Sequence, residues 1–85
     1  MSPSNPLEKE VNPTSTIDAK GLLSPIPLLR LKKELAILRA EEIVQIDSTD
    51  SGTGNDIASW CSKTKYAYLG EKRNVGFTSY FVMKK

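Results

Sequence analysis

Residues 18–27 contain the residue types whose order could support chemistry. Ser24 is followed directly by Pro25. This order is typical of a helix start, because the serine oxygen can accept a hydrogen bond from a helical amide and the proline at the first helical position needs no amide hydrogen. We therefore predict that Ser24 is the N-cap. A cysteine at this position would face the positive end of the helix and would be stabilised as a thiolate, a good nucleophile or sulfur carrier.

The composition limits the chemistry that the chain can perform. Its 85 residues fit one small domain, and 12 basic against 10 acidic residues leave a net charge of +2. Such a small charge argues against binding of nucleic acid, which depends on many phosphate contacts. The chain has no histidine and a single cysteine, Cys61. This excludes an internal disulfide and a cysteine-type zinc site and removes the usual general base, so we expect no cofactor and no metal.

The N-terminal part of the chain differs from the rest. Residues 1–14 carry three of the five prolines among polar side chains, and we predict a flexible N-terminal tail there and a single domain over residues 15–85. No stretch approaches the roughly 20 apolar residues of a membrane span, and no signal peptide is recognisable. We therefore expect no membrane span and a cytoplasmic location.

The first predicted helix covers residues 25–39. Its apolar stripe recurs at helical spacing and consists of Leu28, Leu31, Leu35 and Leu38. The opposite face is basic and includes Arg30, Lys32 and Lys33. A basic face can simply be solvated, and the functional alternative is a docking surface for an acidic partner.

The remaining pattern predicts strands at Ser15–Ala19 and residues 41–47, a second helix over residues 53–64, and a hairpin of residues 66–69 and 77–83 around a turn at 74–76. Thr53 and Asp56 are three residues apart, so we read them as an acidic form of the capping box. The order β-α-β-α-β-β predicts an α+β fold, a two-layer α/β sandwich. Its four-stranded mixed sheet would carry both helices on one face.

The second helix also contains the only thiol, Cys61, which follows Trp60 on the apolar side. A lone cysteine in this setting is typical of a small buried core residue with a raised pKa. We therefore interpret both residues as parts of the core, with Cys61 as the alternative site of thiol chemistry.

With these elements in place, the chain resembles the TusA (SirA-like) sulfur-carrier family over residues 16–85. The family signature is Asp, two residues, Gly, two residues and Cys-Pro-x-Pro. The matching residues are Asp18, Gly21, Ser24, Pro25 and Pro27. A second motif matches at Asp50, Gly52, Thr53, Asp56 and Trp60, and the aromatic strand with its basic end matches at residues 77–85. The one departure is serine in place of the family's cysteine.

The resemblance implies a fold shared with the C-terminal domain of bacterial translation initiation factor three. It also implies sulfur relay: the cysteine accepts persulfide sulfur from a cysteine desulfurase or rhodanese-type donor. It then passes the sulfur to an acceptor protein for tRNA thiolation, cofactor synthesis or sulfur metabolism. Asp18, Gly21, Pro25 and Pro27 would shape the site at position 24, and a monomer is expected.

Serine at position 24 cannot perform this relay, because its oxygen forms no persulfide and is far less acidic than a thiol of pKa about 8.5. Two explanations are open. The serine is either an engineered replacement of the cysteine or the native residue of a cysteine-less paralogue, a non-catalytic interaction or regulatory module. A third class, RNA binding, draws on the fold analogy, which is a weak warrant, and on the aromatic residues Tyr66, Tyr68, Phe77 and Tyr80. These aromatics more simply fill and edge a small sheet.

Overall fold

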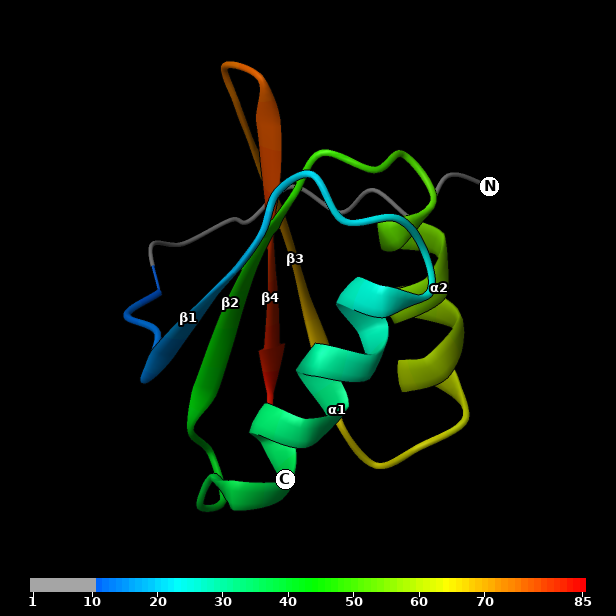
Figure 1. The fold of residues 1–85 in the computed structure, drawn as a ribbon. Helices are drawn as coiled ribbons and strands as arrows, with labels where there is room; N and C mark the ends of the chain where they lie inside the picture. Colours follow the sequence, from blue (N-terminus) through cyan, green and yellow to red (C-terminus); the bar gives the residue numbers. More distant parts are fainter. Residues whose placement is uncertain (1–10) are drawn as a thin grey trace.

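The structure is a computed structural model that describes residues 11–85. The elements in chain order are β1 (Ser15–Ala19), α1 (Ile26–Ile37), β2 (Ile43–Ser48), α2 (Thr53–Ser62), β3 (Ala67–Asn74) and β4 (Phe77–Met83). The strands form one sheet in the order β1-β2-β4-β3. Both helices lie on the same face of this sheet (Figure 1). The predicted two-layer α+β fold is therefore confirmed.

The sheet is mixed, and its one parallel pair is β1 with β2. The register of this pair ends with Ala19 opposite Ser48, so both strands finish at the same edge of the sheet. The β3–β4 pair is antiparallel and forms the predicted hairpin. Gly76 has a φ of +85° in its turn, a conformation that glycine adopts without steric cost.

The core lies between the sheet and the helices. Val44 and Ile46 alternate along β2 and are fully buried, as are Leu31 and Leu35 on α1 and Ile57 on α2. The spacing of four residues between the two leucines places them on one face of the helix. The apolar stripe predicted from the sequence is therefore the surface that joins the two layers.

The β3 strand extends well beyond the predicted residues 66–69. It pairs with β4 as far as Asn74 opposite Phe77, although its second half is polar. Glu71 is buried there, and its carboxylate accepts a hydrogen bond from Arg73 Nε at 3.0 Å. Pairing with a complete neighbouring strand thus outweighs the weak local preference of these residues for a strand.

The tail predicted over residues 1–14 is only partly within the structure, because residues 1–10 lie outside the described residues. Thr14 extends the contact between β1 and β2: its amide donates to the carbonyl of Ile43 at 2.7 Å. No helix within residues 11–85 is long and apolar enough to cross a membrane.

The core contact of α1 leads to a stability prediction. Leu35→Ala should lower the free energy of unfolding by about 2–5 kcal/mol, because it leaves a cavity at a fully buried position. Ile37→Ala, two residues further on, is the control, since Ile37 is 75% exposed and its loss should change stability by less than about 0.5 kcal/mol. Urea unfolding followed by circular dichroism measures both values. Equal effects of the two substitutions would contradict this packing.

Candidate functional site

Two loops meet at the edge where the parallel strands end. The first joins β1 to α1 over residues 20–25, and the second joins β2 to α2 over residues 49–52. The amide of Gly21 donates to Thr49 Oγ1 at 2.9 Å and ties the loops together. Carboxyl ends of parallel strands are the usual place for sites in α/β sheets. In this chain, the carboxyl ends of β1 and β2 bring together two loops that are about 30 residues apart in the sequence.

The first loop has a defined shape. Gly21 has a φ of +83°, in the left-handed region that favours glycine. The Oδ1 atom of Asp18 accepts a hydrogen bond from the amide of Lys20 at 3.1 Å, and the amide of Leu22 donates to Ala19 at 3.1 Å. These contacts hold the chain as it turns towards Ser24.

The prediction that Ser24 caps α1 is wrong. The helix begins at Ile26 with Pro25 as its N-cap, and no side chain caps it. The first helical hydrogen bond runs from the amide of Leu29 to the carbonyl of Pro25 at 3.1 Å, so the helix starts one residue later than predicted. The hydroxyl of Ser24 is instead a donor, and its acceptor is Asp56 Oδ2 on α2.

The predicted capping box of Thr53 and Asp56 is also wrong. Gly52 is the N-cap of α2, and no side chain caps this helix. The Thr53 hydroxyl lies 2.8 Å from the Ser48 hydroxyl in the interior, and Asp50 Oδ2 accepts the amide hydrogen of Gly52 at 3.1 Å. Asp56 is therefore the residue near position 24 that we missed. Its place in the second family motif was the only signal that could have revealed it.

Position 24 is fixed in orientation and open to other molecules. Ser24 is exposed, and its Cβ would lie 3.7 Å from a Cβ built on Gly52. Leu23 and Ile26 on either side are also exposed, and such apolar groups favour contact with another protein. Pro27, by contrast, is fully buried and anchors the first turn of α1. A side chain at position 24 is thus accessible from outside the protein.

The three basic residues proposed for docking do not form one cluster. Arg30 and Lys33 line a hollow of about 350 Å³ together with Ile17 and Glu34. The ammonium group of Lys32 lies over the Trp60 ring, 5.5 Å from its centre. Arg30 and Lys33 are therefore available to a common partner surface, whereas Lys32 packs towards α2.

Cys61 lies in the interior, in agreement with the interpretation from the sequence. It is 7% exposed, and burial raises the pKa of its thiol to about 11. Trp60 beside it is half-buried and stacks on Tyr66, with ring centres 5.0 Å apart. Since a thiol must ionise to react, Cys61 is a poor nucleophile at neutral pH.

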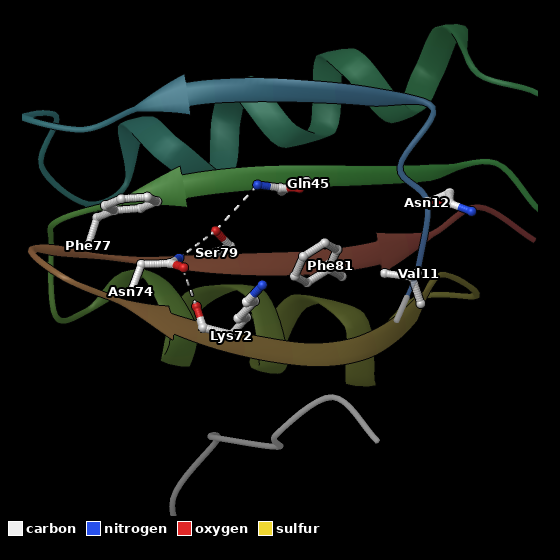
Figure 2. Close-up of a pocket in the computed structure, with 8 residues that line it drawn as sticks. All are labelled: Val11, Asn12, Gln45, Lys72, Asn74, Phe77, Ser79 and Phe81. Atoms are coloured by element: carbon white, nitrogen blue, oxygen red, sulfur yellow. Dashed lines mark hydrogen bonds between the residues drawn. The ribbon is translucent and has the colours of Figure 1, made fainter. Parts of the chain in front are cut away.

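The face of the sheet opposite the helices carries a polar network around Ser79 (Figure 2). The Ser79 hydroxyl donates to Asp47 Oδ1 at 2.6 Å and accepts from the side-chain amides of Asn74 at 3.0 Å and Gln45 at 3.3 Å. The hollow beside it measures about 330 Å³. Because these groups bind one another across three strands, we assign the network to the cohesion of the sheet.

Of the aromatic residues considered for RNA binding, Tyr80 is buried, whereas Tyr66, Tyr68 and Phe77 are half-buried. Tyr80 and its neighbour Phe81 are 6% and 4% exposed, so these two rings offer no surface on which a nucleic-acid base could stack. Within residues 11–85, no group of three or more histidine, cysteine or acidic side chains is placed to hold a metal ion.

The fold and the site together define a class: a small α+β domain with an exposed turn, which includes position 24, before its first helix. The family model described as Sulfurtransferase TusA matches residues 15–85. The chain therefore belongs to the TusA family.

Individual relatives agree with this assignment. The sulfur carrier protein TusA of Pseudomonas entomophila is 32% identical over 71 residues, which cover 84% of this chain and 89% of that protein. The Bacillus subtilis protein YrkF is 35% identical over 71 residues, 84% of this chain, but the chain spans only 38% of its length. The crystal structure of a SirA-like protein from Desulfitobacterium hafniense superposes with a TM-score of 0.68 at 26% identity. The match covers 82% of this chain and 96% of the SirA-like protein's chain.

The environments of positions 24 and 61 lead to a prediction about thiol reactivity. At pH 8 only about 0.1% of a thiol with a pKa near 11 is ionised, so iodoacetamide should modify Cys61 very slowly in the folded chain. In the Ser24→Cys variant, one thiol per chain should react at least tenfold faster than Cys61, because position 24 is exposed. Mass spectrometry over time measures both rates, and unfolding in guanidinium should make every thiol reactive. Rapid labelling of the folded parent chain would show that Cys61 is accessible.

Proposed function

We propose that this chain is a sulfur-carrier domain whose carrier position is residue 24. With serine at that position, it docks to sulfur-relay partners and carries no sulfur itself. The main support is the placement of Ser24, which is exposed at the turn before α1 and flanked by the exposed apolar residues Leu23 and Ile26. Membership of the TusA family and the similarity to proteins named as sulfur carriers point to the same role.

The relay requires a thiol at position 24. Its thiolate attacks the outer sulfur of a donor persulfide, a new S–S bond forms, and the donor's S–S bond breaks to release the donor thiolate. The transfer conserves electrons and needs no external oxidant. A serine oxygen cannot take part, because it stays protonated at neutral pH and no histidine is present to accept its proton. With serine at position 24, the chain is therefore inactive in sulfur relay.

The loop around position 24 serves the same function by holding its shape. Gly21 permits the turn, Asp18 binds the amide of Lys20, and Pro25 and Pro27 define the start of α1. None of these four residues needs to contact sulfur. Each would act by presenting residue 24 to a donor and then to an acceptor.

The partners proposed on this basis are a cysteine desulfurase or rhodanese-type donor and an acceptor relay protein in the cytoplasm. The acceptor would act in tRNA thiolation, cofactor synthesis or sulfur metabolism. Arg30 and Lys33 are the candidates for contact with acidic groups on these partners, because they share one hollow. We expect the chain itself to be a monomer.

Intact mass measurement tests the carrier position. The parent chain and its Ser24→Cys variant are each incubated with a cysteine desulfurase and cysteine, and a second sample of each is then reduced. We expect a reducible gain of sulfur on the variant alone. A gain on the parent chain would move the chemistry to Cys61. No gain on either chain with any desulfurase or rhodanese donor would reject the proposal.

The second candidate is a native interaction module without relay. It is favoured by the exposed surface around Ser24, which needs no thiol in order to bind. Both candidates predict docking, but only this one makes the serine the functional residue. A Ser24→Cys variant that docks to a relay partner but never gains sulfur would favour this candidate.

Docking can be measured by competition. An excess of the parent chain should slow sulfur loading of the Ser24→Cys variant, because both compete for the same donor. The double substitution Arg30→Glu and Lys33→Glu should weaken this inhibition about tenfold or more by placing like charges opposite an acidic partner surface. Lys63→Glu with Lys65→Glu is the matched control, since both lysines are exposed at the end of α2. Equal inhibition by all three competitors would show that Arg30 and Lys33 do not contact the donor.

A further inference from the structure

The contact between Ser24 and Asp56 affects the chemistry of position 24 as well as the shape of the loop. Asp56 lies in the first turn of α2, 32 residues along the chain, and its Oδ2 accepts the hydrogen of the Ser24 hydroxyl. The side chain at position 24 is therefore directed at a carboxylate. A hydrogen-bond donor at this position can share its hydrogen with that carboxylate, whereas a negatively charged group is repelled by it.

The charges around position 24 do not neutralise Asp56. No lysine or arginine of residues 11–85 forms an ion pair with it, and Lys20 of the adjoining loop lies beside Asp18 and the Phe77 ring. On the other side of Gly52 is a second acid, Asp50, whose Oδ2 accepts the amide hydrogen of Gly52. The starts of α1 and α2 are positive contributions, each of only about half an elementary charge, and Asp56 itself lies in the first turn of α2.

We infer that Asp56 is a positioning residue that sets the protonation state of a thiol carried at position 24. This inference rests on the proposed function. A neutral thiol can donate its hydrogen to the carboxylate as the serine hydroxyl does, whereas a thiolate would face a like charge. Both effects favour the neutral form and raise the pKa of the thiol. The full charge of Asp56 is in direct contact with position 24 and outweighs the partial charge that each of the two helix starts contributes.

The consequence concerns when the carrier reacts. In the free protein, the thiol is held neutral and directed at α2, and it reacts with small electrophiles and oxidants more slowly than an exposed thiol without the carboxylate, although faster than the buried Cys61. A donor or acceptor that brings a positive group to Asp56 cancels the carboxylate's effect and ionises the thiol within the complex. Asp56 thereby restricts the reactivity of the thiol to the docked state. This effect is the reverse of the stabilisation of a thiolate that the sequence led us to expect at this position.

The test uses the full chain with Ser24→Cys, with and without Asp56→Asn. The pKa of the introduced thiol is obtained from the pH dependence of its alkylation by iodoacetamide, with no sulfur donor present. We expect Asp56→Asn to lower this pKa by about one unit, which corresponds to a roughly tenfold larger thiolate fraction at pH 7. Asp56→Glu should keep the pKa high, because the negative charge is retained.

Controls separate this effect from a general change in charge or structure. Glu34→Gln removes the same charge from α1 in the Ser24→Cys background and should leave the pKa unchanged. Asp56→Ser supplies a second neutral variant should Asp56→Asn not fold. An unchanged pKa in a folded neutral variant, or an equal fall in Glu34→Gln, would overturn the inference. Because no sulfur transfer is measured, this result is independent of the mass measurement that tests the proposed function.

Discussion

The parallel pairing of β1 with β2 is the constraint on which the site depends. Its register places Ala19 opposite Ser48, so the two strands end together and the loops that follow them begin side by side. The hydrogen bond from Gly21 to Thr49 keeps the loops in contact. Each loop then leads into a helix, and both helices lie on the same face (Figure 1). Ser24 and Asp56 meet because of this arrangement, although neither is close to the other in the chain.

The same arrangement creates two very different environments for a thiol. Position 24 is exposed, held by a defined loop and adjacent to a carboxylate. Cys61 is buried on α2, where loss of solvation raises its pKa. A carrier needs the first kind of position, because its sulfur must enter the active sites of other proteins. The thiol in this chain occupies the second kind, and the serine occupies the first.

Side chains near the helix starts illustrate the limits of local reasoning. Ser24 before Pro25 and Thr53 before Asp56 both match capping patterns, yet no side chain of either pair caps a helix. Capping patterns describe only residues within one turn of each other. Here Thr53 pairs with Ser48 in the interior and Ser24 pairs with Asp56 across the loops. The partners of these hydroxyls, five and 32 residues away along the chain, are side chains and not the helical amides that the local pattern predicts.

The sequence by itself determined the order of the elements, the bounds of β1, the apolar stripe of α1 and the family motifs, because periodicity and turn residues act over a few positions. Only the tertiary structure decided how far β3 extends and which side chains meet at position 24. The polar half of β3 forms a strand because β4 is present to pair with it. The contact of the Asp56 carboxylate with Ser24 depends on the register of the parallel strands, which no local pattern encodes.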